Sequence, residues 1–105
     1  MQTAETMRSD STITIGSLEI EPRAYRATLD GRVLALSPSQ LELLRALVVN
    51  RDRVVSRAEL AKAAGLEQAG SVDVVLSSLR RMFGEAFVRN VRNRGWILEP
   101  SAFER

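Results

Sequence analysis

The fold of this chain is decided by Ser71-Val-Asp-Val-Val-Leu-Ser-Ser-Leu-Arg-Arg-Met-Phe83 and by Phe87-Val-Arg-Asn-Val-Arg-Asn-Arg-Gly-Trp-Ile-Leu98, which follows closely. In the first stretch apolar side chains recur at the spacing i, i+4, i+7, i+11, which places them on one face of a helix. We interpret these residues as core: Val72, Leu76, Leu79 and Phe83. The second stretch predicts a strand, a tight basic turn and a return strand.

Arginines gather where this helix ends and where the hairpin turns. Arg80 and Arg81 lie near the end of the helix, and Arg92 and Arg94 lie at the turn. An α-helix fits the major groove of DNA, and a cationic hairpin can reach along the backbone or into the minor groove. The two stretches therefore predict a winged helix, with residues 71–83 as recognition helix and 87–98 as wing.

Upstream of this helix, apolar and polar residues alternate in short runs. The runs in residues 13–20 break at Gly16-Ser17, and those in residues 25–36 turn at Asp30-Gly31, a dipeptide typical of tight hairpins. This alternation predicts an N-terminal antiparallel β-sheet.

Two capping boxes predict helices between the sheet and the recognition helix. Ser37 with Gln40 opens a helix that ends near Asn50, and Ser56 with Glu59 opens a shorter one. Between these two helices, residues 53–55 are expected to form a brief extended connector.

Glycine and serine mark the remaining helix ends. Gly65 stops the second helix, Ser71 caps the third and Gly84 ends it. The predicted fold is α+β, a winged helix-turn-helix with an N-terminal antiparallel β-sheet, three helices and a C-terminal β-hairpin wing, in the order β-β-β-α-α-α-β-β. The predicted division is a disordered tail or linker at 1–11, a winged-helix DNA-binding domain at 12–100 and a C-terminal tail at 101–105.

The composition excludes several classes of site. The 105 residues contain neither Cys nor His, which removes disulfides, thiolate or zinc sites and histidine-based acid–base catalysis. No apolar run reaches the roughly 20 residues that span a bilayer, and residues 1–11 lack the apolar segment of a signal peptide. We therefore expect a cytoplasmic protein that is no enzyme, with no metal, no cofactor and no membrane partner.

The net charge is only +2, but the positive charges are unevenly placed. Residues 80–105 hold six arginines against Glu85, Glu99 and Glu104, and Lys62 is the one lysine. Arginine offers planar, multi-donor contacts to phosphate and guanine. A merely solvated basic end would show the same excess, so charge alone leaves both interpretations open.

The chain resembles the C-terminal effector domains of OmpR/PhoB-type response regulators in two-component systems. The resemblance is carried, from about residue 13 to 98, by Leu36-Ser-Pro-Ser-Gln-Leu-Glu-Leu-Leu44, Arg53-Val-Val-Ser-Arg-Ala-Glu-Leu60, Val72-Asp-Val-Val-Leu-Ser-Ser-Leu-Arg-Arg81 and Val91-Arg-Asn-Arg-Gly-Trp96. It implies a sequence-specific transcription factor that binds tandem or inverted half-sites, often as a dimer.

The recognition helix departs from the family pattern. Where the family usually has Arg-Thr-Val-Asp-Val-His-Ile-Arg-Arg-Leu-Arg-Lys, this chain has Gly70-Ser-Val-Asp-Val-Val-Leu-Ser-Ser-Leu-Arg-Arg81. In the wing, Arg92 matches the family's arginine, Arg94 adds a charge, and Trp96 replaces an aromatic that packs the wing or stacks on a base. Fewer cations on the helix imply a shallower salt dependence of DNA binding.

The sequence predicts that double-stranded DNA is bound by side chains of the helix and the wing. The candidate DNA-binding residues are Ser71, Val74, Val75, Ser77, Ser78, Arg80, Arg81, Arg89, Asn90, Arg92 and Arg94. Among them, the valines either contact thymine methyl groups or, for Val75, lie against the edge of the core.

Two functions remain open on the sequence. The first is a DNA-binding transcriptional regulator, for which the resemblance implies a homodimer on DNA and RNA polymerase as a candidate partner through residues 65–70. The alternative is a winged-helix protein–protein interaction or regulatory module that has lost tight DNA binding, because the helix lacks the family's arginines.

Overall fold

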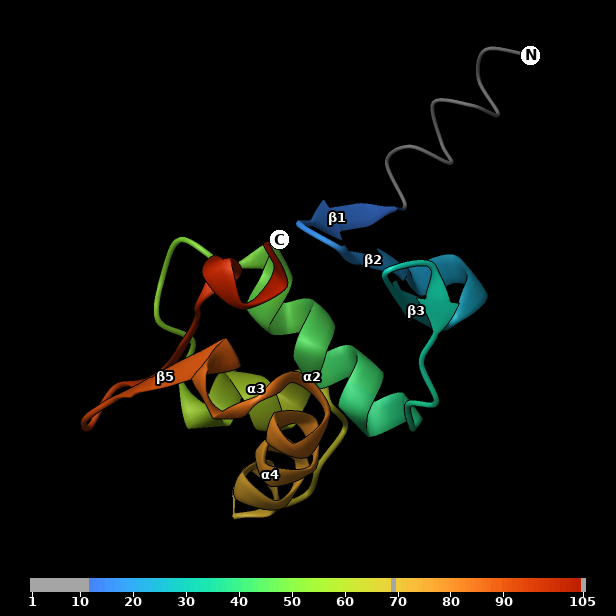
Figure 1. Ribbon diagram of the computed structural model, residues 1–105. Coiled ribbons are helices and arrows are strands. Elements are labelled where there is room, and N and C mark those ends of the chain that lie inside the picture. Colours follow the sequence, from blue (N-terminus) through green and yellow to red (C-terminus); the bar gives the residue numbers. More distant parts are fainter. Residues whose placement is uncertain (1–11, 69, 105) are drawn as a thin grey trace, which may run out of the picture.

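The computed structural model describes residues 12–68 and 70–104. These residues form an antiparallel sheet, three α-helices and a C-terminal hairpin, which confirms the predicted architecture. Figure 1 shows the N-terminal sheet at one end, the hairpin with β5 at the other, and the helices between them. The predicted tail or linker at residues 1–11 lies outside the described part of the chain.

The N-terminal sheet has the strand order β1-β2-β3-β4. Its strands are β1 (Ile13–Ile15), β2 (Leu18–Glu21), β3 (Arg26–Leu29) and β4 (Arg32–Val33). The predicted order, with three strands here, is wrong by one, because β4 pairs with β3 across the Asp30-Gly31 turn. Both turn residues have a positive φ, 55° and 81°, as a type I′ hairpin turn requires.

Both predicted capping boxes are present at the starts of α2 (Pro38–Val49) and α3 (Arg57–Ala63). In each box the serine hydroxyl accepts the N–H of the residue three positions on, whose side chain accepts the N–H of the serine. Asn50 is the C-cap of α2, as predicted. The chain's own sequence thus sets where the two supporting helices begin.

The third helix, α4 (Ser71–Phe83), begins differently from the prediction. Ser71 is the first helical residue rather than the cap, and Gly70 occupies the N-cap position without any side-chain hydrogen bond. Gly84, with a φ of 101°, ends the helix as predicted.

The wing consists of β5 (Val88–Val91) and β6 (Gly95–Leu98). The predicted extended connector adds to it: Val55 and Trp96 exchange two backbone hydrogen bonds of 2.7 and 2.9 Å. At Gly95 a Cβ atom would collide with the carbonyl oxygen of Val55, so only glycine permits this approach. The base of the wing is therefore hydrogen-bonded to the residues that immediately precede α3 in the sequence.

The segment Pro100–Phe103 is part of the fold rather than a tail. Among the described residues, three short 3-10 helices occur: η1 (Pro22–Ala24), η2 (Glu85–Phe87) and η3 (Pro100–Phe103). Phe103 is buried, and its ring meets Phe83 edge to face at a centroid distance of 5.3 Å. Its carbonyl accepts hydrogen bonds from the backbone N–H and the hydroxyl of Ser17. The prediction of a tail at 101–105 is wrong for residues 101–103, because Phe103 closes the core.

One hydrophobic core joins the sheet, the helices and the wing. Across residues 12–68 and 70–104, no polar or charged residue is buried, which leaves the ionisable side chains at the surface. No helix in this part of the chain is long and apolar enough to cross a bilayer.

Candidate nucleic-acid interface

The recognition helix α4 divides into a core face and an outward face. Val72, Leu76 and Leu79 are buried, and Phe83 packs against the core, which confirms the predicted apolar stripe. On the opposite side Val74 is 70% exposed. A further three of the predicted contact residues lie on this outward side: Ser77 and Arg81 are exposed, and Ser71 is half-buried.

Two other candidates on the helix are engaged within the protein. Val75 is partly buried against the core, as one of the two predictions for this residue has it, rather than free to contact a thymine methyl group. The hydroxyl of Ser78 donates to the carbonyl of Val75 at 2.7 Å and accepts from Nε2 of Gln40 at 2.8 Å. Because a hydroxyl has one proton, Ser78 has no donor left for a base.

Arg80 and Arg81 occupy different environments at the end of α4. The guanidinium of Arg80 donates to the carbonyl oxygens of Glu85 and Val88, both at 3.3 Å, and its side chain is only 25% exposed. Arg80 thus joins the end of α4 to the start of the wing. Arg81 is exposed and makes no ion pair with the described residues.

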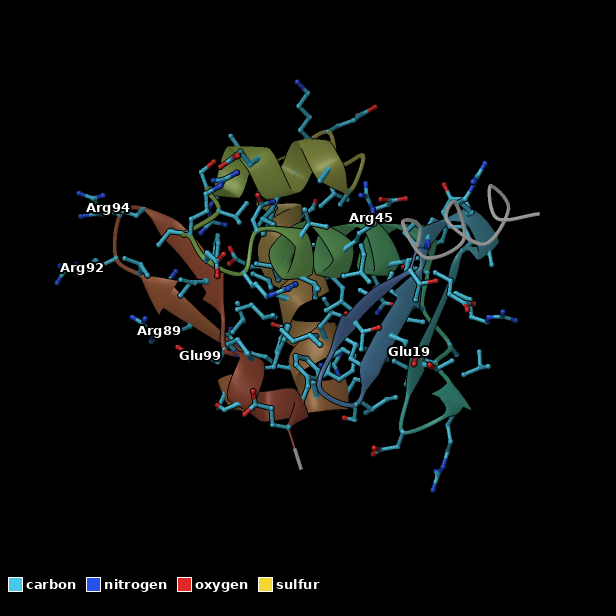
Figure 2. All side chains as sticks on the ribbon, turned by 90° about the horizontal axis from the view of Figure 1, so that it is seen from above. Glu19, Arg45, Arg89, Arg92, Arg94 and Glu99 are labelled. Atoms are coloured by element: carbon cyan, nitrogen blue, oxygen red, sulfur yellow. The ribbon has the colours of Figure 1, made fainter. Side chains whose placement is uncertain are left out.

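The wing carries its cations in two groups. At its base, Nε of Arg89 lies 2.8 Å from a carboxylate oxygen of Glu99, so that charge is locally balanced. Asn90 donates across the hairpin to the carbonyl of Gly95. At the tip, Arg92 and Arg94 are exposed, point away from the body in Figure 2 and pair with no described acid.

A groove of about 570 Å³ separates the start of α3 from the wing. It is lined by Ser56, Arg57, Ala58, Asn90, Arg92, Asn93, Arg94, Gly95 and Trp96. The backbone of Asn93 is left-handed, with a φ of 65°, which forms the turn between the strands. No acidic residue lines the groove, so its electrostatic character is cationic.

Arg57 is the charged residue of this groove that the sequence did not reveal as a site residue. Its guanidinium carbon lies 4.8 Å from the centre of the Trp96 ring, and Nη1 lies 2.7 Å from Oδ2 of Asp73. Arg57 therefore touches the wing and the first turn of α4 at once. The partners are 16 and 39 positions away in sequence, so no local spacing indicates the contact. Trp96 is buried, which is consistent with the packing role considered for it.

The connector in front of α3 is held by a surface ion pair. Arg53 binds Glu59 with its Nη2 2.8 Å from Oε2, and this hydrogen bond lowers the pKa of Glu59 to about 2, aided by the backbone N–H of Ser56. The same carboxylate raises the pKa of Arg53. Across residues 12–68 and 70–104, no group of three or more acidic side chains is placed to hold a metal ion.

The fold and this cationic surface define the class of the molecule as a winged-helix domain. A family model described as "Transcriptional regulatory protein, C terminal" matches residues 31–98. The chain belongs to this family, the C-terminal domains of OmpR/PhoB-type response regulators.

Relatives of known name cover most of this chain. The response regulator protein PmrA of Pseudomonas aeruginosa is 31% identical over 91 residues, which are 83% of this chain and 41% of PmrA. The transcriptional regulatory protein TrcR of Mycobacterium tuberculosis is 32% identical over 99 residues, 88% of this chain and 38% of TrcR. The chain thus spans about two-fifths of the length of these relatives.

Solved structures match the fold closely. The Klebsiella pneumoniae RstA DNA-binding domain, crystallised in complex with the RstA box, is 32% identical with a TM-score of 0.72, covering 85% of this chain and 97% of that one. The DNA-binding domain of CpxR from E. coli is 27% identical with a TM-score of 0.73, covering 83% and 94%.

Proposed function

We propose that this chain binds duplex DNA sequence-specifically and regulates transcription, with α4 in the major groove and the wing on the backbone or in the minor groove. One observation carries the proposal: Asp73 of α4 and Trp96 of the wing meet on the single guanidinium of Arg57. The start of the recognition helix and the cationic wing therefore lie side by side, as elements that contact one duplex must.

The contacts available differ in kind between the helix and the wing. On α4, Val74 offers an apolar contact for a thymine methyl group, and Ser77 offers one hydroxyl. Cationic contacts come from Arg81 and from the two arginines at the wing tip, Arg92 and Arg94. The helix therefore has few charged side chains for base recognition, and most of the electrostatic attraction to DNA comes from the wing.

The test of this function is binding to a random-sequence duplex pool, followed by sequencing of the retained fraction. Fluorescence anisotropy measures the binding at low salt and at about 150 mM salt. We expect a phased half-site motif to be enriched at both salt concentrations. Binding that is unselective and disappears by about 150 mM salt would contradict the proposal, because it would reflect generic attraction to phosphate.

A second function, a protein-interaction module, is favoured by one specific feature. Val74 is a large apolar side chain that is 70% exposed on the outward side of α4. If α4 binds a protein, replacing both Arg92 and Arg94 by alanine leaves that binding intact. If α4 binds DNA, the same replacement weakens a gel shift, most strongly at low salt.

Further partners follow from membership of the family. We expect two copies to bind adjacent half-sites as a homodimer on DNA, and sedimentation with a duplex of one or two half-sites tests this. RNA polymerase is a candidate for the loop between α3 and α4, where Leu66 packs against the core and Glu67 and Gln68 are exposed. A regulator of this kind works in the cytoplasm, where it meets DNA.

A further inference from the structure

We propose that the groove between α3 and the wing binds a phosphate of the DNA backbone, and that Arg57 is the central cation of this site. The inference rests on the proposed function, because the phosphate belongs to duplex DNA. The site adds α3 as a third element that contacts DNA, beside the recognition helix and the wing tip. The groove offers about 570 Å³ between the two elements, room enough for a phosphodiester group.

Arg57 is held in place by contacts that leave most of its donors unused. The ring of Trp96 lies beneath the guanidinium at 4.8 Å, and Asp73 accepts one hydrogen bond of 2.7 Å. A guanidinium has five N–H donors, and the side chain of Arg57, which lines the groove, is 42% exposed. A planar cation fixed in this way loses little conformational freedom when it binds phosphate.

The remaining lining of the groove suits an anion. Arg92 and Arg94 also line the groove, at the wing tip, and neither has an acidic partner among the described residues. Ser56 and Asn93 add a hydroxyl and an amide. The acidic partner of Arg57, Asp73, is not among the lining residues and instead ties the groove to the first turn of α4. A phosphate held here would therefore lie on the strand that passes the start of the recognition helix.

The test is the salt dependence of duplex binding by Arg57→Gln, measured with the enriched duplex by fluorescence anisotropy. Loss of one phosphate contact should reduce the slope of log K against log salt by about 0.9. Raising the salt from about 50 to about 200 mM should then weaken DNA binding by Arg57→Gln by a factor that is about 3.5 times smaller than the factor for the wild type. Arg57→Lys, which keeps the charge, should retain most of the wild-type slope.

Two variants separate a phosphate contact from other effects. Arg45→Gln is the matched control, because Arg45 is also paired with an acid (Glu42, at 3.0 Å) and is 39% exposed, but lies on α2 far from the wing tip (Figure 2). We expect its slope to equal that of the wild type. Asp73→Asn breaks the ion pair but keeps the cation, and it should also retain the slope.

Several outcomes would overturn the inference. The inference fails if Arg57→Gln keeps the wild-type slope, or if Arg45→Gln loses as much slope as Arg57→Gln does. It also fails if Asp73→Asn loses as much slope as Arg57→Gln, because Arg57 would then be a positioning residue only. Trp96 is the single tryptophan of the chain, so its fluorescence provides a second readout that needs no variant. Unchanged emission at saturating duplex also contradicts the inference. If the wild type binds no duplex at all, the proposed function itself fails.

Discussion

Replacing Arg92 and Arg94 together by alanine should reduce the salt dependence of DNA binding without unfolding the domain. Both side chains are exposed at the tip of the wing, and neither is paired with an acid in the described part of the chain. Surface substitutions of this kind usually change stability by less than about 0.5 kcal/mol. A change in affinity can then be assigned to the interface.

The magnitude follows from counterion release. Each neutralised phosphate contributes about 0.9 to the slope of log K against log salt, so the loss of two contacts lowers the slope by about 1.8. Over the fourfold increase from about 50 to about 200 mM, the double variant should lose about 12-fold less affinity than the wild type. Most of the difference between the two proteins therefore appears at low salt.

The assay is a salt titration of anisotropy with a fluorescent duplex, and the control is the double replacement of Arg23 and Arg32 by alanine. These two arginines are also exposed, but they lie by the N-terminal sheet at the other end of the molecule. Each double variant removes two positive charges, which brings the formal net charge from +2 to 0. An equal loss of slope in both would refute the reasoning, because it would show that net charge alone attracts the duplex.

Three further predictions concern the core, base recognition and pH. Phe103→Ala should lower the free energy of unfolding by about 3–5 kcal/mol, measured by urea denaturation, because it empties a buried site beside Phe83; a loss near zero would contradict the placement of η3 in the core. Replacing thymine by deoxyuridine in the selected duplex should weaken wild-type binding by about fourfold per contacted methyl group and leave Val74→Ala unaffected; equal sensitivity of both proteins would argue against this contact. Because the pKa of Glu59 is lowered from 4.5 to about 2 in the folded protein, its ion pair with Arg53 contributes fully above about pH 4.5 and is lost as pH falls toward 2. Thermal unfolding of Glu59→Gln should accordingly show a smaller acid-side decline in Tm than the wild type, and identical acid-side profiles would contradict the assignment.

The elements predicted correctly from the sequence are those with local signals. The capping boxes at Ser37 and Ser56 and the Asp30-Gly31 turn each fix a backbone geometry within four residues, so the sequence shows them directly. For α4 the sequence predicts Ser71 as the N-cap, one residue after the observed N-cap Gly70, because serine is a common cap and glycine has no side chain to indicate one.

The features that the sequence did not show depend on distant partners. Phe103 lies in a segment without periodicity, and it is buried only because Phe83 and Phe87 meet it in space. Arg57 is an ordinary first residue of a capped helix until the fold brings Asp73 and Trp96 to it. Nothing in the sequence around Ser78 indicates that its hydroxyl accepts a hydrogen bond from Gln40, which lies 38 positions away.

The internal bond of Ser78 changes how the departure of α4 from the family pattern should be understood. Two serines stand where the family has two arginines, and one of them, Ser78, uses its proton within the protein. Substituting arginine for Ser78 would therefore add a cation and also remove the hydrogen bond that joins α4 to Gln40 of α2. On the proposed interface α4 would contribute mainly shape and apolar contact, with Arg81 as its exposed cation, whereas the wing and Arg57 would contribute most of the charge. Under this proposal specificity and electrostatic affinity reside largely on different elements, and Arg57, which contacts both Asp73 of α4 and Trp96 of the wing, joins the two.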